Sequence, residues 1–147
     1  MKTTERQYKY VEWLSAEAMH DDSRKWLLEL KFIKDELLFF DDLIKSYTLQ
    51  LIDSEHFAES KKFVDRLSKF HKKTDSLLKM VKTHESKLEI MVDGIDQPKE
   101  EDSYKEKHRW LITNVDQFLH KYRTFKTQLF GLIKRIIKEQ RQKRLLQ

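Results

Sequence analysis

The fold is decided by residues 26–52, which read WLLELKFIKDELLFFDDLIKSYTLQLI. Apolar side chains recur here at alternating steps of four and three, at Trp26, Leu30, Ile33, Leu37, Phe40, Ile44, Tyr47 and Leu51. This 3.5-residue repeat places them on one stripe of an α-helix, and such a stripe is buried against other helices. Sixteen of the 27 residues are apolar. Because one narrow seam needs fewer, we expect this helix to lie centrally in a bundle or to share a face with a second copy.

The same spacing marks two further helices. The first is expected from about residue 55 to 92, with a stripe at Phe63, Leu67, Phe70, Thr74, Leu77, Val81, His84, Leu88 and Met91. The second is expected from about 98 to 145, with a stripe at Tyr104, His108, Leu111, Val115, Phe118, Tyr122, Phe125, Leu129, Leu132 and Ile136. A turn near Asp53–Ser54 and a loop around Gly94 separate the three segments, since Ser54 suits an N-cap and Gly94 a C-terminal cap.

The sequence therefore predicts an all-α fold, an elongated up-down-up antiparallel three-helix bundle with coiled-coil-like seams, as a single domain over residues 1–147. Short connections make neighbouring helices antiparallel. The first helix is expected over about residues 4–52, and its N-terminal segment either extends it or forms a short extra helix. The apolar spacing slips at residues 20–23. This slip indicates either a helix break with a new N-cap or a stutter in one continuous helix.

Composition narrows the class of protein. Charged residues make up 37% of the chain and aromatic residues 12%, with only two glycines and one proline. Few turn-forming residues favour long helices over a many-stranded β fold. The absence of cysteine excludes disulfides, thiolate metal sites and thiol catalysis. The sequence contains neither a signal-peptide core nor a membrane-spanning apolar run, so we expect a cytoplasmic protein.

The net charge of +5 comes from the C-terminal end. Residues 131–147 contain one acid, Glu139, and a basic patch of Lys134, Arg135, Lys138, Arg141, Lys143 and Arg144. Cations at a helix C-terminus complement the helix dipole. A basic amphipathic helix end also suits a nucleic acid or an anionic membrane, so the patch is a candidate binding surface for either partner.

The antiparallel arrangement predicts two histidine layers. His84 should face His108, with His20, Asp22 and Ser23 of the first helix at the same height. His71 should face His120, level with Asp35 and Glu36. Imidazole and carboxylate groups together suit zinc, iron or manganese. The candidate metal ligands are therefore His20, His84, His108, His71, His120 and Glu36.

The alternative is that these layers are polar positions that fix helix register or respond to pH. A di-iron carboxylate centre is disfavoured, because Glu17–His20 forms the only Glu-x-x-His pair. No glycine-rich phosphate loop or nucleophile elbow is present. We therefore expect no catalytic residues and no cofactor.

The leading hypothesis is a non-enzymatic helical interaction protein that packs against itself, as a homodimer, or against a helical partner. Its predicted contact residues are Leu27, Leu38 and Phe39, which lie beside the main stripe of the first helix. The alternatives are binding of nucleic acid or anionic membrane through the basic patch, and metal binding by the histidine layers.

Overall fold

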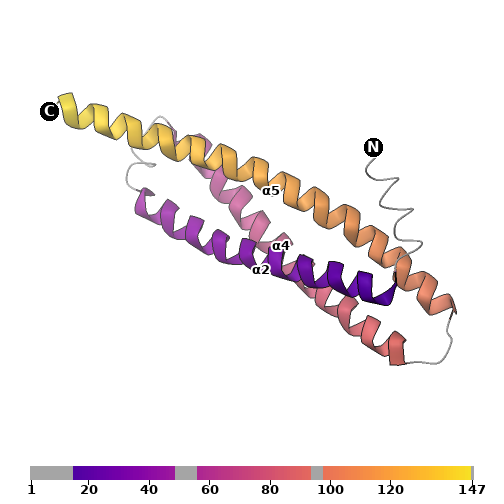
Figure 1. The fold of residues 1–147 in the computed structure, drawn as a ribbon. Helices are drawn as coiled ribbons and strands as arrows, with labels where there is room; N and C mark the ends of the chain where they lie inside the picture. Colours follow the sequence, from indigo (N-terminus) through magenta and orange to yellow (C-terminus); the bar gives the residue numbers. More distant parts are fainter. Residues whose placement is uncertain (1–14, 49–55, 94–97, 147) are drawn as a thin grey trace.

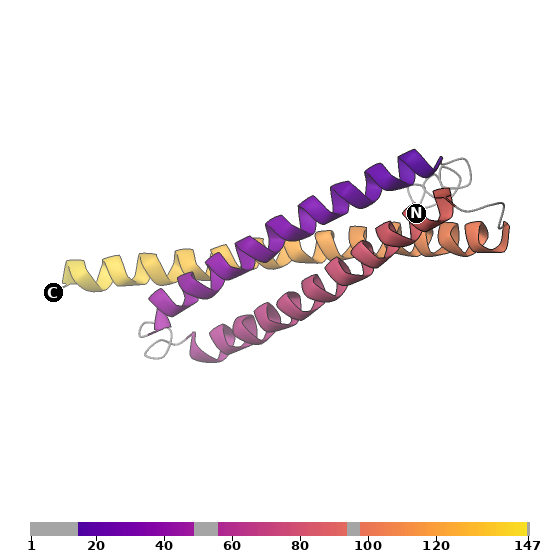
Figure 2. The same ribbon diagram turned by 90° about the horizontal axis from the view of Figure 1, so that it is seen from below.

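A computed structural model describes residues 15–48, 56–93 and 98–146 of the chain. It contains three helices: α2 (Ala16–Ser46), α4 (Phe57–Asp93) and α5 (Pro98–Leu146). Helix α4 runs antiparallel to both α2 and α5 and packs against both (Figures 1 and 2). The predicted all-α, up-down-up three-helix fold is confirmed. The turn expected near Asp53–Ser54 and the loop around Gly94 lie outside the described residues.

Helix α2 begins at Ala16, and the N-terminal segment, which was expected either to extend this helix or to form a short extra helix, lies largely outside the described residues. Ser15 is extended, with ψ of 161°, and its Oγ accepts a hydrogen bond from the Ala18 N–H at 3.2 Å. This N-cap satisfies one of the free donors of the first turn. From there α2 is continuous through residues 20–23, where a break was one of two alternatives, and it ends at Ser46 rather than near 52. Residues 1–14 and 49–55 lie outside the described part.

The three apolar stripes meet in one elongated core. Leu30, Leu37, Phe40, Leu77, Val81, Leu111 and Phe125 have no exposed surface, and Phe118 retains 4%. Aromatic rings fill the middle, where Phe70 lies between Phe118, Tyr122 and Phe125 at centroid distances of 4.8–5.8 Å. The backbones of α2 and α5 approach each other less closely than either approaches α4. The face between α2 and α5 is therefore the more open side of the bundle.

Helix α5 is longer than its neighbours, with 49 residues against 31 in α2 and 37 in α4. Its C-terminal end extends beyond both of them in both views (Figures 1 and 2). Ile136 is its last buried residue, and residues 141–146 are all exposed. None of the three helices has an apolar stretch long enough to cross a lipid bilayer.

Replacing Phe125 by Ala should lower the free energy of unfolding by about 3–5 kcal/mol, because a fully buried aromatic ring leaves a cavity that three packed helices cannot close. Phe57→Ala is the matched control, since Phe57 is 53% exposed, and its expected effect is about 0.5 kcal/mol or less. Urea unfolding followed by circular dichroism measures both. Equal losses in the two variants would contradict the assignment of the core.

Candidate functional site

A buried line of polar groups crosses the bundle near the N-terminus of α2. His84 of α4 and His108 of α5 are 2% and 0% exposed. Nε2 of His84 lies 2.9 Å from Nδ1 of His108, and Nε2 of His108 lies 2.9 Å from Oδ2 of Asp22 on α2. The structure therefore brings His84, His108 and Asp22 together, as the antiparallel register predicts.

Aromatic rings enclose this histidine pair. The Tyr104 ring stacks on His84 with centroids 3.9 Å apart and an angle of 5°, and the Trp26 ring lies 4.9 Å from that of His108. The layer divides the core into a long cluster and a small end cluster around Met19, Leu88 and Tyr104. Burial raises the pKa of the Tyr104 phenol, which therefore stays neutral in this layer.

Burial also controls the charge of His84. It lowers the pKa of His84 from 6.5 to about 3, and the nearby charges of His108, Lys107 and Lys87 act in the same direction. A buried imidazolium is unfavourable because it loses its hydration, and a second positive charge beside it adds repulsion. His84 is therefore neutral over the physiological pH range.

The other predicted metal ligands are not gathered around a common point. His20 contacts Glu85, and Glu36 accepts a hydrogen bond from the Tyr122 hydroxyl at 2.7 Å and pairs with Lys126 at 2.9 Å. Within residues 15–48, 56–93 and 98–146, no three histidine, aspartate or glutamate side chains are grouped to hold a metal ion.

The second histidine layer does not form as expected. His71 lies 2.9 Å from Asp41 of α2, while His120 is exposed on α5. The antiparallel register fixes the height of a residue to about one turn, but it does not fix the face on which the side chain lies. His71 turns toward α2, and His120 toward solvent.

The predicted contact residues of α2 differ in exposure. Leu27 is partly buried against the core, whereas Leu38 and Phe39 are 53% and 56% exposed. Leu28 and Phe32 are exposed further, at 69% and 63%. The sequence did not single out these two residues, because exposure depends on where α4 and α5 lie around α2.

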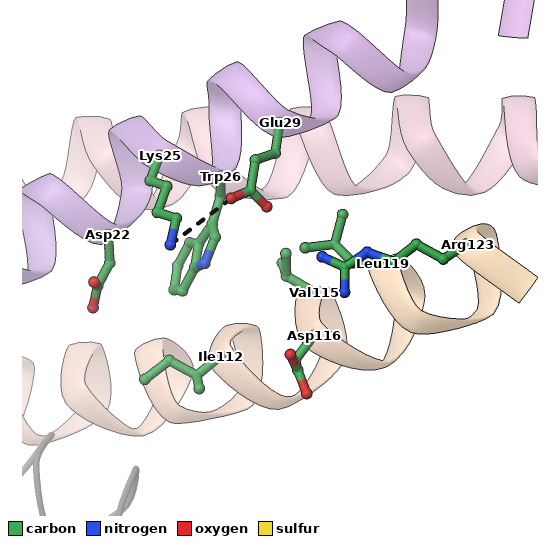
Figure 3. Close-up of a pocket in the computed structure, with 9 residues that line it drawn as sticks. All are labelled: Asp22, Lys25, Trp26, Glu29, Ile112, Val115, Asp116, Leu119 and Arg123. Carbon is green, nitrogen blue, oxygen red and sulfur yellow. Dashed lines mark ion pairs between the residues drawn. The ribbon is translucent and has the colours of Figure 1, made fainter. Parts of the chain in front are cut away.

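A groove follows the open side of the bundle between α2 and α5. Its first part has a volume of about 320 Å³ and lies over Trp26, Val115 and Leu119, with the Lys25–Glu29 ion pair at its edge (Figure 3). A second part of about 450 Å³ shares Glu29, Leu119 and Arg123 with the first and is bordered by Leu28 and Phe32. The exposed apolar residues of α2 therefore adjoin a concave surface.

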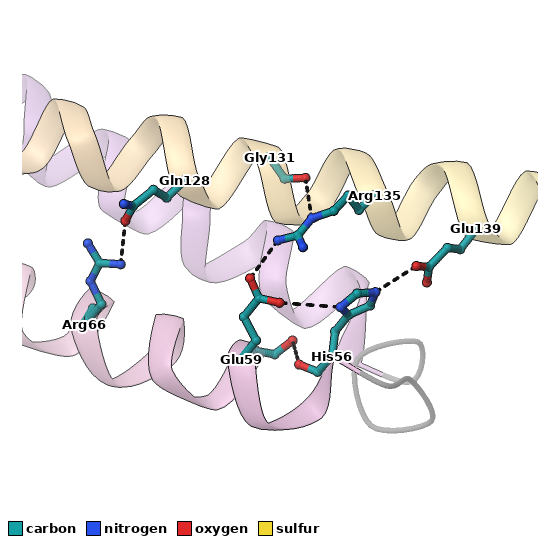
Figure 4. A network of polar contacts seen from close by, with 8 residues as sticks. His56, Glu59, Arg66, Gln128, Gly131, Arg135 and Glu139 are labelled. Carbon is teal, nitrogen blue, oxygen red and sulfur yellow. Dashed lines mark hydrogen bonds and ion pairs between the residues drawn. The ribbon is translucent and has the colours of Figure 1, made fainter.

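At the opposite end of the bundle, one residue of the basic patch forms an ion pair within the protein. Arg135 contacts Glu59 at 2.7 Å, and Glu139 lies 2.8 Å from His56 (Figure 4). The hydrogen bond with Glu139 raises the pKa of His56, and the one with Arg135 lowers the pKa of Glu59. The remaining cations of the patch are exposed: Lys134, Lys138, Arg141, Lys143 and Arg144.

His84 should make the protein less stable in acid. Because its pKa is lowered in the folded state, its contribution is complete above pH 6.5, where the unfolded chain is also neutral at this position. Below pH 6.5 the unfolded chain binds a proton that folded His84 does not, so stability falls by about 1.4 kcal/mol per pH unit toward pH 3. His84→Gln should flatten this decline in the urea midpoint between pH 6.5 and 4.

His71→Gln is the matched control, because His71 is a half-buried histidine with a carboxylate partner and lies on the same helix. It leaves the His84 contribution in place, so the acid-dependent loss attributed to His84 should persist. A His84→Gln variant with the same pH profile as the parent would show that this residue does not bind fewer protons in the folded state.

Comparisons with protein families, with curated proteins and with solved structures found no match to this chain. A function for this protein is therefore inferred from the arrangement of its side chains. Two features stand out on that basis: the exposed apolar residues of α2, and the polar line through His84, His108 and Asp22.

Proposed function

We propose that this protein is a non-enzymatic helical interaction protein that self-associates through the outer face of α2. The outer face is defined by Leu28, Phe32 and Phe39, together with a line of charged residues beside them. The observation that supports the proposal is that these three large apolar side chains are each more than half exposed on one helix. Large apolar side chains exposed on one face of a helix suit a protein–protein contact.

The three apolar residues form a second seam. Leu28, Phe32 and Phe39 stand at i, i+4 and i+11, which brings them onto one stripe of α2. At about 100° per residue, this stripe lies on the side of the helix away from Leu30 and Leu37 of the core. Helix α2 therefore has one seam for the bundle and a second one that no other described helix covers.

The charges beside this seam have a self-complementary order. Arg24, Lys31, Asp35 and Asp42 follow one line of the helix, at i, i+7, i+11 and i+18. All four are exposed, and none has an ion pair within the described residues. The line is positive in its N-terminal half and negative in its C-terminal half, and it is symmetric about residue 33.

This symmetry favours an antiparallel pair of α2 helices related by a two-fold axis, since such an interface is isologous. Arg24 would then face Asp42 of the second copy, and Lys31 would face Asp35. Phe32 would meet its counterpart near the axis. A parallel pair would instead place like charges opposite each other, which is destabilising.

The oligomeric state tests this proposal. The full chain should elute as a dimer in size-exclusion chromatography with light scattering, and Phe32→Glu combined with Phe39→Glu should make it monomeric without loss of helix. Ile90→Glu is the control, because Ile90 is 72% exposed on α4, away from the outer face. A parent that is monomeric at all concentrations would contradict the proposal.

Charge reversal tests the antiparallel geometry. Arg24→Asp should weaken the dimer by placing an acid opposite Asp42, and adding Asp42→Arg should restore it, since the two charges are exchanged across the two-fold axis. Each exposed pair contributes only about 0.2–1 kcal/mol, but symmetry presents the pair twice. If the double variant dissociates more than the single variant, the helices do not pair in this direction.

A second candidate function is binding of an anionic membrane surface by the C-terminal end of α5. Leu145 and Leu146 are 86% and 88% exposed next to Arg141, Lys143 and Arg144, on a helix end that extends beyond the bundle. Apolar and basic residues together on one projecting helix end are typical of interfacial helices.

The four substitutions Lys138→Gln, Arg141→Gln, Lys143→Gln and Arg144→Gln should abolish salt-sensitive binding to vesicles that contain anionic lipid. The control exchanges four exposed lysines of α4 for glutamine, at Lys61, Lys62, Lys72 and Lys73, which gives the same change in net charge. Co-sedimentation at low and high salt measures both. Binding to DNA but not to vesicles would assign the patch to nucleic acid instead.

A further inference from the structure

A second groove lies on α4 and α5, on a part of the surface formed without α2. It has a volume of about 300 Å³ and is lined by Lys79, Met80, Thr83, His84 and Lys87 of α4 and by Lys107 of α5. Three of the six residues are lysines and none is acidic. In the described part of the chain, no carboxylate forms an ion pair with any of these lysines. The groove is therefore a concentration of uncompensated positive charge.

The lysines surround a buried polar group rather than a plain surface. His84 lines the groove although its side chain is only 2% exposed. The charges of Lys107 and Lys87 are near enough to affect its pKa, and the ammonium of Lys107 is held 4.2 Å from the Trp110 ring centroid. Nε2 of His84 is bonded to His108, while its other ring nitrogen, Nδ1, has no partner among the described residues.

The polar line fixes the hydrogen-bonding character of that nitrogen. An ionised Asp22 only accepts, so Nε2 of His108 must donate to it. If both histidines are neutral, Nδ1 of His108 accepts and Nε2 of His84 donates. Nδ1 of His84 is then a bare lone pair, which repels an anion in the groove.

One added proton reverses this arrangement. A proton taken from solvent binds Nδ1 of His84, and the proton on Nε2 of His84 moves across the 2.9 Å hydrogen bond to Nδ1 of His108. His108 becomes an imidazolium that donates to both Asp22 and His84. Neither ring turns over, and Nδ1 of His84 becomes an N–H donor.

We propose that this groove binds a tetrahedral oxyanion, as a free ion or as the phosphate group of a small ester, and that binding is coupled to uptake of one proton by the His84–His108 pair. The lysines supply charge and His84 supplies a donor that exists only in the protonated pair. Charge-assisted hydrogen bonds of this kind are stronger than neutral ones. The groove lies away from the outer face of α2, so the proposal is independent of self-association.

The charged and titratable groups around His84 and His108 favour uptake of one proton rather than two. Burial lowers the pKa of His84 to about 3 and the charge of His108 acts in the same direction, so the two rings are not charged at once. Asp22 on α2 balances the imidazolium, and Tyr104 on α5 stays neutral. The groups that face the pair are Asp22 from α2, Lys79 and Lys87 from α4, and Tyr104 and Lys107 from α5.

Titration of the full chain with sodium sulfate at constant ionic strength tests the proposal, because sulfate keeps its charge between pH 5.5 and 7.5. Calorimetry should give one site per chain, with affinity rising as the pH falls by up to about tenfold per pH unit, the limit for uptake of one proton. Nitrogen NMR should show Nδ1 of His84 becoming protonated as sulfate binds. Equal affinity at both pH values would overturn the coupling.

Two sets of variants separate the lysines from the proton. Lys87→Gln with Lys107→Gln should weaken sulfate binding by about tenfold, through loss of two charge-assisted contacts. Lys72→Gln with Lys73→Gln removes the same charge from exposed positions of α4 outside the groove and should have no effect. Asp22→Asn should leave binding at its pH 7.5 level and abolish the pH dependence. Equal affinities in the two lysine variants would overturn the site.

Competition with sulfate distinguishes the two sources of the oxyanion. Inorganic phosphate displaces sulfate if the groove takes a free ion, and glycerol phosphate displaces it if the groove also admits an ester. Displacement by either compound supports the site, and failure of both to displace sulfate contradicts it.

Discussion

Every feature of this molecule depends on the burial of one 3.5-residue stripe from each of three helices. This chain has no cysteine and few turn-forming residues. Removal of the apolar stripes from water therefore makes the main favourable contribution to its free energy of folding. Leu30, Leu77 and Leu111 have no exposed surface, and the same holds for Phe125 further along the seam. Once the stripes are buried, the faces on which the helices meet are set, and the polar residues that stand in a stripe, such as Thr74, His84 and His108, are buried with it.

The histidine layer shows the effect of a polar residue in a buried apolar stripe. A polar residue in a buried stripe has to find its partner inside the protein, because an unsatisfied polar group is costly there. His84 and His108 meet this requirement by bonding to each other and to Asp22. A slip by one turn would separate these groups. The layer therefore favours one register of α4 against α5 over its neighbours, in the manner of polar positions in coiled coils.

The sequence was sufficient for the fold and for part of the site. Seam spacing predicts the helices and their order, and connection lengths predict that His84, His108 and Asp22 share one level. The face of a helix on which a side chain lies is harder to predict than its height along the bundle. His71 bonds to Asp41 rather than lying opposite His120, because the orientation of a side chain around the helix axis depends on the tilt of the neighbouring helices. The start of α2 at Ala16, with Ser15 as its N-cap, was not predicted, since a single N-cap is a weak local signal beside a strong apolar repeat.

The two ends of the bundle are held by different physical forces. Near the start of α2 the helices are joined by buried imidazoles, which dissolved salt barely reaches, while at the other end they are joined by the partly exposed pairs Arg135–Glu59 and His56–Glu139. Ionic screening acts on exposed charges and hardly on buried ones. Concentrated salt would therefore loosen one end and acid the other, so that the two ends of the bundle open locally under separate conditions.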